Sequence, residues 1–180
     1  MARACAVTGH RPTRFKFKYK EDYSLCKKIK RAMSEQIAKL HDELGVKRYY
    51  IGGTLGVDIW AGEIILRLKE KPGYEDIELI VVRPFSGHDK KWDERSRRRL
   101  QFLIKHCTED IIAGEQDCRQ TYIIRNCLMA DHAEYLLAVY DDKKCPGSRT
   151  MQMVDYAMKT GKSIIYIHPD TARVKINNPG

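Results

Sequence analysis

The sequence alternates short apolar runs with longer segments of helical periodicity, and this alternation constrains the fold more than any other feature. Residues 79–82 (LIVV) and 135–140 (YLLAVY) are apolar at nearly every position, which is typical of strands buried on both faces of a parallel sheet. The segments between such runs repeat apolar residues every three or four positions, as Ile29, Met33 and Ile37 do, which favours helices.

Six apolar runs predict strands at residues 4–7, 46–51, 77–82, 110–113, 135–140 and 163–167. Helices are predicted at 23–44, 57–69, 91–106, 121–131 and 151–159. The chain therefore predicts an α/β protein with a Rossmann-like, open and mostly parallel sheet of about six strands and helices on both faces. No linker divides the sequence, so residues 1–180 are expected to form a single domain. The basic and aromatic stretch 11–20 is expected to be a mobile loop, and residues 176–180 a frayed tail.

The 33 Lys and Arg residues exceed the 24 Asp and Glu residues and give a net charge of +9, an excess that attracts polyanions without identifying one. No apolar stretch approaches the roughly 20 residues of a membrane span, and the amino terminus lacks a signal-peptide pattern. We therefore expect a cytoplasmic protein that does not contact membranes.

The six cysteines show no C-x-x-C spacing and do not cluster with histidines. Free, mostly buried thiols and the absence of a metal site are expected. Cys145, in a loop with proline and glycine, is the thiol whose reactivity would be worth testing.

Ligands of an open parallel sheet bind outside the carboxyl ends of its strands, near the point where the strand order reverses. The residues at the predicted strand ends are rich in glycine, hydroxyl, arginine and carboxylate groups, which handle phosphate and ribose. They are Thr8-Gly9-His10-Arg11, Gly52-Gly53-Thr54-Leu55-Gly56, Arg83-Pro84-Phe85 and Tyr140-Asp141-Asp142.

Two glycine-containing turns admit two interpretations each. The turn from Gly52 to Gly56 could bring backbone amides and a helix amino terminus to a phosphate, or could be a tight turn in which Asp58 stabilises the first helical turn. It matches neither G-x-G-x-x-G nor a Walker A loop. In the second turn, Ser148 or Thr150 could cap the next helix or contact a second phosphate.

The remaining charged residues give weaker signals. Arg125-Asn126 is interpreted from its pattern as a solvated helix face, and so is the run Arg-Ser-Arg-Arg-Arg at 95–99, because successive helical residues point in different directions. No catalytic constellation emerges. Asp58 and Glu63 are the carboxylates nearest the inferred site, and either could polarise a ribose hydroxyl or a water.

Two motifs resemble the YpsA-like branch of the SLOG superfamily, namely Thr8-Gly9-His10-Arg11-Pro12 and the segment from Gly52 to Glu63 (GGTLGVDIWAGE). The likeness continues through Pro84-Phe85, Arg125-Asn126 and the segment up to Asp141. The resemblance implies a Rossmann-like fold and a pocket for nucleotides or NAD-derived molecules such as ADP-ribose. It assigns to that pocket Gly9, Arg11, Gly52, Gly53, Gly56, Asp58, Glu63, Arg125, Asn126 and Asp141.

The chain departs from that superfamily at two places. The P-G-G-x-G-T-x-x-E signature of its phosphoribohydrolases is absent, and Gly147-Ser148-Arg149-Thr150 stands where relatives often carry Gly-Gly-Thr. The missing signature puts hydrolytic activity in doubt. The different loop sequence at 147–150 changes which groups that loop can bind.

The expected function is to bind a nucleotide or NAD-derived ligand, as a sensor or a sequestering protein, with no further cofactor. The predicted ligand-binding residues are Thr8, Gly9, Arg11, Gly52, Gly53, Gly56, Arg83, Arg125, Asn126, Asp141, Gly147, Ser148 and Thr150. The first alternative is an N-glycosidase or phosphoribohydrolase that uses Asp58 or Glu63. The second is a single-stranded nucleic-acid-binding module that uses residues 16–20 and 95–99. Apolar helix faces on such domains often dimerise, so a homo-oligomer is a further expectation.

Overall fold

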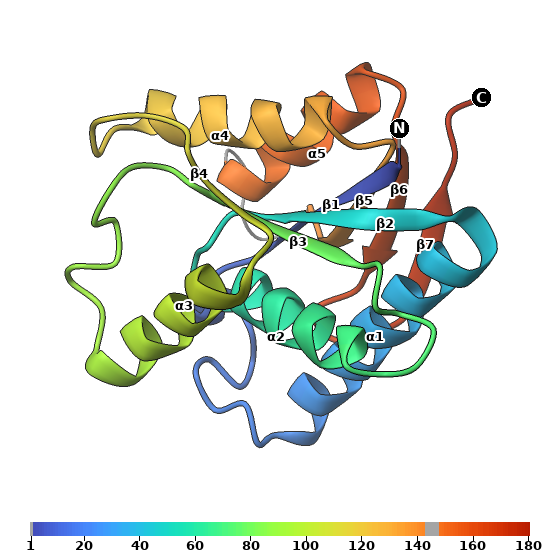
Figure 1. The fold of residues 1–180 in the computed structure, drawn as a ribbon, viewed down its shortest axis with the longest axis horizontal. Helices are drawn as coiled ribbons and strands as arrows, with labels where there is room; N and C mark the ends of the chain where they lie inside the picture. Colours follow the sequence, from blue (N-terminus) through green and yellow to red (C-terminus); the bar gives the residue numbers. More distant parts are fainter. Residues whose placement is uncertain (1, 143–147) are drawn as a thin grey trace.

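The computed structural model describes residues 2–142 and 148–180 and contains one sheet of seven strands in the order β4-β3-β2-β1-β5-β6-β7 (Figure 1). The strands are β1 (Arg3–Gly9), β2 (Val46–Ile51), β3 (Glu78–Arg83), β4 (Glu109–Ile112), β5 (Tyr135–Val139), β6 (Ser163–Ile167) and β7 (Val174–Asn177). The helices are the 3-10 turn η1 (Pro12–Arg14), α1 (Ser24–Leu44), α2 (Val57–Lys69), α3 (Glu94–His106), α4 (Arg119–Asp131) and α5 (Arg149–Lys159).

The predicted α/β class and the mostly parallel sheet are confirmed. Strands β1 to β6 pair in parallel, while β7 pairs antiparallel with β6. This seventh strand was missed, and the prediction of a frayed tail from residue 176 is wrong for Ile176 and Asn177. All four β7 residues are exposed, so this short edge strand carries no apolar run that its sequence could reveal.

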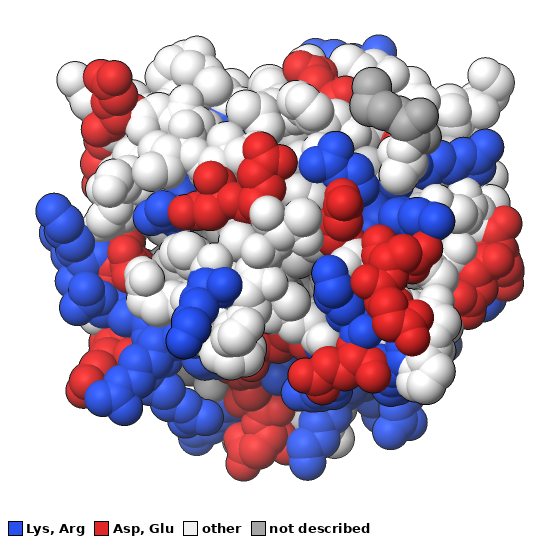
Figure 2. Space-filling view, in the orientation of Figure 1, with Lys and Arg blue, Asp and Glu red and all other residues white. Residues whose placement is uncertain are grey.

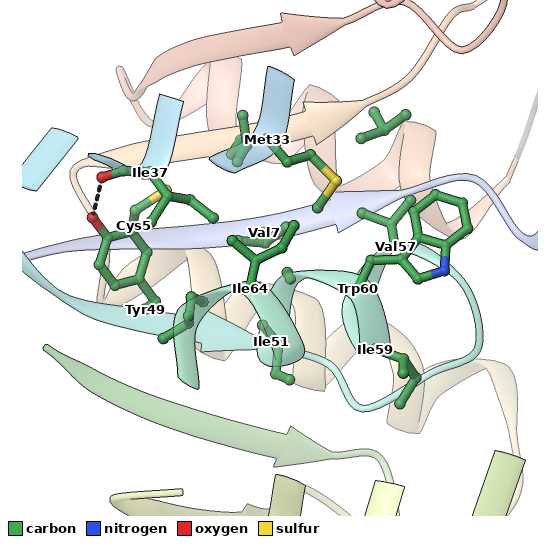
Figure 3. Close-up of a cluster of buried hydrophobic side chains, with 14 of the residues drawn as sticks. Cys5, Val7, Met33, Ile37, Tyr49, Ile51, Val57, Ile59, Trp60 and Ile64 are labelled. Carbon is green, nitrogen blue, oxygen red and sulfur yellow. Dashed lines mark hydrogen bonds between the residues drawn. The ribbon is translucent and has the colours of Figure 1, made fainter. Parts of the chain in front are cut away.

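The sheet lies between two helical layers, with α1, α2 and α3 on one face and α4 and α5 on the other (Figure 1). Each face has its own hydrophobic core. On the first face, Ile29, Met33 and Ile37 of α1 meet Trp60 of α2 and the inward side chains of the central strands. Figure 3 shows this core, including the hydrogen bond of 2.9 Å that the buried Tyr49 hydroxyl donates to the carbonyl of Ile37.

Several helix boundaries follow local capping chemistry. Helix α3 begins at Glu94 rather than at residue 91, because the Asp93 side chain accepts a hydrogen bond of 3.0 Å from the Ser96 amide. Such a cap satisfies an amide that the helix itself cannot pair. Gly45 ends α1 in the left-handed conformation with φ 69°, the usual glycine ending.

The segment 11–20 is anchored by its aromatic residues, contrary to the expected mobile loop. Phe15 and Phe17 are buried, with their rings stacked 5.0 Å apart. Both rings also lie against the indole of Trp60, at 5.4 and 6.0 Å. The lysines of the segment, Lys16 and Lys18 among them, remain exposed.

The described cysteines are free thiols, as predicted, but only Cys5 and Cys26 are fully buried. Burial raises the pKa of Cys5 to about 12, so this thiol stays protonated at neutral pH. Cys118 is exposed, and Cys145 lies outside the described residues. None of the described helices combines the length and the apolar character needed to cross a membrane.

Candidate functional site

The strand order reverses between β1 and β5, and a hollow of about 510 Å³ opens at the carboxyl ends of these two strands. A reversal of this kind separates the loops that follow the two strands and leaves room for a ligand. The hollow is lined by the segment after β1 and by the start of α5, through His10, Arg11, Thr13, Arg14, Ser148, Arg149 and Thr150.

Arg125 is buried beneath this edge of the sheet, although its pattern predicted a solvated helix face. Its side chain donates hydrogen bonds to the carbonyl of Gly52 at 2.5 Å and to Asn126 Oδ1 at 2.9 Å. Within the described residues its guanidinium forms no ion pair, and Asp58 is the carboxylate that acts on it electrostatically. Burial lowers the pKa of Arg125 to about 10, against the opposing effect of Asp58. A cation is therefore held at this edge with little compensation.

Arg11 and Arg149 add two more cations to the same neighbourhood. Burial lowers the pKa of Arg11, Asp58 opposes this shift and Arg149 adds to it. The Arg149 guanidinium lies 3.7 Å from the ring centre of Tyr122, and that of Arg125 lies 5.6 Å from the same ring. Arg11 and Arg125 thus share Asp58 as a nearby carboxylate and Arg149 as a neighbouring cation, an arrangement that favours an anion.

Asn126 and Thr150 fix the start of α5 against the sheet. Asn126 accepts from Arg125 and donates to the carbonyl of Arg149 at 3.1 Å. The Thr150 hydroxyl donates to the carbonyl of Gly9 at 3.0 Å. Ser148 caps α5 by accepting from the Met151 amide at 3.0 Å, which is the capping interpretation of this turn. Gly147 lies outside the described residues.

The glycine turn after β2 is closely packed. Gly53 and Gly56 have φ values of 67° and 89°, in the left-handed region that favours glycine. A Cβ on Gly56 would come within 3.2 Å of the Pro12 ring, so the segment after β1 covers the amino terminus of α2. Asp58 accepts from the Thr54 amide at 3.1 Å and from its hydroxyl at 2.5 Å. Asp58 thus binds Thr54 within the turn and lies in the first turn of α2, whereas its stabilisation of that helical turn and a phosphate on the turn's amides both stay predictions.

Two further predicted glycine and threonine positions lie at the end of β1. Thr8 is buried and pairs with Ala138 of β5. A Cβ on Gly9 would come within 2.4 Å of the Val57 side chain, so only glycine lets α2 approach β1 this closely.

Asp141 belongs to a polar network beside the hollow. It pairs with Arg14 at 2.7 Å and with His10 at 3.0 Å, and Arg14 also reaches Asp170 at 3.4 Å. Burial lowers the pKa of His10 despite Asp141. Asp141, His168 and Asp170 bring three ligand atoms within 4.8 Å of one another and could hold a metal ion. Because Arg14 already neutralises both carboxylates, this group does not point to a metal.

Glu63 and Arg83 lie apart from the hollow. Glu63 pairs with Arg99 of α3, which also binds Glu21 at 2.6 Å. Arg83 pairs with Asp110 of β4 at 2.6 Å. Neither side chain lines the hollow, so the structure does not bring them together with the other predicted ligand-binding residues.

Sequence reasoning missed several residues of this region. Arg149, Tyr122 and Arg14 were not assigned to the site, although Arg149 stood in a turn that was singled out, and His10 was placed at a strand end without being given a role in binding. The signal that could have indicated a role for Arg149 is its position at the start of the helix that follows β5, next to the point where the strand order reverses.

Comparisons with known proteins agree with this architecture. The model of the YspA SLOG family matches residues 5–172. UPF0398 proteins of Bacillus cereus (strain B4264) and Bacillus thuringiensis (strain Al Hakam) are each 28% identical over 159 residues, covering 87% of this chain and 83% of each relative.

Two solved structures share the fold. DNA processing protein A (DprA) from Streptococcus pneumoniae matches 92% of this chain with a TM-score of 0.60 and 18% identity. DNA processing protein A from Helicobacter pylori, whose structure concerns its single-stranded DNA binding mode, matches 92% with a TM-score of 0.58 and 22% identity. The chain spans 50% and 65% of these two proteins. At such identities the likeness concerns the fold.

Proposed function

Since the chain belongs to the YspA SLOG family, we propose that it binds a nucleotide or an NAD-derived nucleotide such as ADP-ribose, with the phosphates in the hollow between β1 and β5. The observation that carries this proposal is the gathering of three arginines, in which Arg149 lies close enough to act on both Arg11 and Arg125, while Asp58 is the carboxylate that acts on these two. Such an excess of positive charge beside a hollow suits an anion.

The three arginines have different roles in this proposal. Arg11 and Arg149 line the hollow and would contact phosphate oxygens through paired N–H groups, which arginine offers in a planar fork. Arg125 lies below, held by Gly52 and Asn126, and would add positive potential. The amino terminus of α5 would contribute backbone amides and the positive end of its dipole. A protein built in this way would sense or sequester a signalling nucleotide.

A thermal unfolding panel tests the proposal with NAD, ADP-ribose, cyclic ADP-ribose isomers and nucleoside mono-, di- and triphosphates. A ligand at about one hundred times its Kd adds about 2.7 kcal/mol, or roughly 5–10 °C for a chain of this size. Arg149→Ala should abolish the shift, because Arg149 is exposed and makes no ion pair among the described residues. Arg98→Ala is the matched control, since Arg98 is an exposed arginine of α3 that pairs with Glu94 and does not line the hollow. A panel without any shift would contradict the proposal.

The N-glycosidase alternative has less support. Asp58 is engaged by Thr54 and faces arginines, whereas a general base needs a carboxylate within reach of a water or hydroxyl. Glu63 is paired with Arg99 away from the hollow. Asp58→Asn separates the two functions, because a binder should keep or gain affinity for ADP-ribose when the negative charge is removed. A hydrolase would instead lose the release of free base.

Binding of single-stranded nucleic acid is a second candidate, favoured by an exposed basic and aromatic surface. Figure 2 shows Lys and Arg side chains gathered over α3 and over the loop that precedes α1. In that loop Tyr19 and Tyr23 are 62% and 52% exposed, among the exposed Lys16, Lys18 and Lys20. Aromatic rings between cations can stack bases while the cations bind the backbone.

Fluorescence anisotropy with a labelled oligothymidylate tests this candidate. The logarithm of the affinity should fall linearly with the logarithm of the salt concentration. Tyr19→Ala should weaken binding by about 1–3 kcal/mol if its ring stacks a base. Exposed Ile124 on α4 provides the control variant Ile124→Ala. Affinity that is independent of both salt and Tyr19 would exclude this surface.

A further inference from the structure

A second and larger hollow adjoins the arginine-lined one. It is a groove of about 760 Å³ between α5 and the edge strand β7, with β6 and the end of β5 as its floor. Its volume lies within the range of about 300–1,000 Å³ that is usual for small-molecule sites.

The two hollows share a wall. The ring of His10, which lines the arginine-lined hollow, lies 5.2 Å from the ring of Tyr140, which lines the groove. Tyr140 in turn lies 6.5 Å from Tyr166 on the groove floor. A ligand with phosphates beside Arg149 therefore needs to pass only the His10–Tyr140 pair to enter the groove.

The groove differs from the arginine-lined hollow in its chemistry. Tyr140 and Tyr166 provide ring surfaces, and Val154 and Met158 of α5 provide an apolar wall. Met158, in the last turn of α5, is 52% exposed and leaves apolar surface open to a ligand. Within the described residues, neither tyrosine hydroxyl forms a hydrogen bond.

Carboxylates complete the groove. Asp142 and Asp155 both line it. Burial, followed by Asp155 and Asp142, raises the pKa of Tyr140 to about 12, and the same groups raise the pKa of Tyr166. Both carboxylates therefore act on the rings of the groove floor. Neither forms an ion pair within the described residues.

Arg173, which precedes β7, and Lys175 of β7 line the opposite wall. The groove thus carries both signs of charge around an aromatic floor. The aliphatic parts of the Arg173 and Lys175 side chains can cover the face of a flat ring. This is unlike the arginine-lined hollow, among whose described lining residues there is no carboxylate.

We propose that the groove between α5 and β7 binds the nucleoside half of the ligand, with an amine-bearing base stacked on Tyr166 and the base or ribose donating hydrogen bonds to Asp142 and Asp155. This inference rests on the proposed function, because it assumes that the phosphates lie in the adjacent hollow. Flat bases stack on tyrosine faces, and carboxylates accept the N–H and O–H groups that such a ligand offers.

Isothermal titration calorimetry with ADP-ribose and with pyrophosphate tests this assignment. The wild-type protein should bind both, because both carry the diphosphate. Tyr166→Leu and Asp155→Asn should each weaken ADP-ribose binding by about tenfold, the effect of one lost stacking or hydrogen-bond contact. Both variants should bind pyrophosphate within about twofold of the wild-type protein.

Tyr156→Leu is the matched control, since Tyr156 is a half-buried tyrosine of α5 that does not line the groove. Asp155 is exposed, so its variant remains informative if Tyr166→Leu folds poorly. Unchanged ADP-ribose affinity in both groove variants, together with its loss in Arg149→Ala, would overturn the groove assignment and leave the proposed function standing. Absence of ADP-ribose and pyrophosphate binding to the wild-type protein would overturn both.

Discussion

Replacing Gly52 with alanine should disturb the arginine-lined site directly, because the added methyl group has nowhere to go. The new Cβ would lie 2.2 Å from Arg125 Nη1, 2.7 Å from its Cζ and 2.9 Å from Asp58 Oδ2. Contacts below 3.0 Å force a neighbour to move, and Arg125 is buried and held by two hydrogen bonds.

The cost has two parts. Overpacking a well-filled interior costs about 1–3 kcal/mol. Displacing Arg125 also weakens its hydrogen bond to the Gly52 carbonyl, and a bond to a charged group contributes about 1.5–3 kcal/mol. Because the two overlap, we expect Gly52→Ala to lower the free energy of unfolding by about 2–4 kcal/mol, or roughly 5–15 °C in Tm. Gly52 does not have a positive φ, so backbone strain contributes nothing.

Urea unfolding and ADP-ribose calorimetry on the same preparations measure both consequences. ADP-ribose affinity should fall by at least about tenfold in Gly52→Ala, because the displaced guanidinium leaves the site. Gly45→Ala is the comparator, since its φ is 69° and nothing lies within 4 Å of the added Cβ. It should cost about 1–2 kcal/mol from backbone strain alone and leave binding intact. Wild-type affinity in a folded Gly52→Ala protein would refute the role given to Arg125.

Two further predictions concern the segment before α1. Phe15→Ala should lower the free energy of unfolding by about 3–5 kcal/mol, because its fully buried ring packs on an indole; a loss below about 1 kcal/mol in urea unfolding would contradict the anchoring. Burial would raise the pKa of Glu21, but hydrogen bonds from Arg99 and Lys30 prevail and lower it from 4.5 to about 2. The ionised carboxylate therefore stabilises the fold above pH 4.5, and this contribution disappears as the pH falls toward 2. Glu21→Gln should be less stable than wild type by about 1–2 kcal/mol at pH 7, after a discount for partial exposure, with the difference vanishing near pH 2. Glu43→Gln, at an exposed position of α1, should show no such difference in parallel thermal melts.

The sequence allowed the class of fold and its central strands to be predicted, because buried parallel strands must be apolar on both faces. The apolar run at 79–82 predicts a buried strand, and it forms the centre of β3. Strand β7 could not be predicted in the same way. Its residues are all exposed, and it exists because β6 leaves backbone groups open at that edge.

The site was only partly predictable, because local patterns do not record burial. Arg125 reads as a solvated helix residue until α4 is placed over the carboxyl end of β2. Glu63 shows the opposite case, since its proximity along the chain to Asp58 suggested a shared site. It lies five positions further along α2, and it faces α3 and Arg99 instead. The resemblance to a family assigned Arg125 to the pocket, which its spacing did not. The same resemblance also assigned Glu63 to the pocket, where the structure does not place it.

The distribution of paired charges is more informative about function than the net charge of +9. Arg14, Arg83 and Arg99 are each matched by carboxylates, so they contribute little potential at a distance. Arg11 and Arg149 have no such partner among the described residues, and both line the hollow where the strand order reverses. Keeping unpaired cations close together costs free energy through their mutual repulsion, which a bound phosphate would remove. The protein should accordingly gain more stability from a polyanionic ligand at this hollow than from added salt, which screens the repulsion but fills no site.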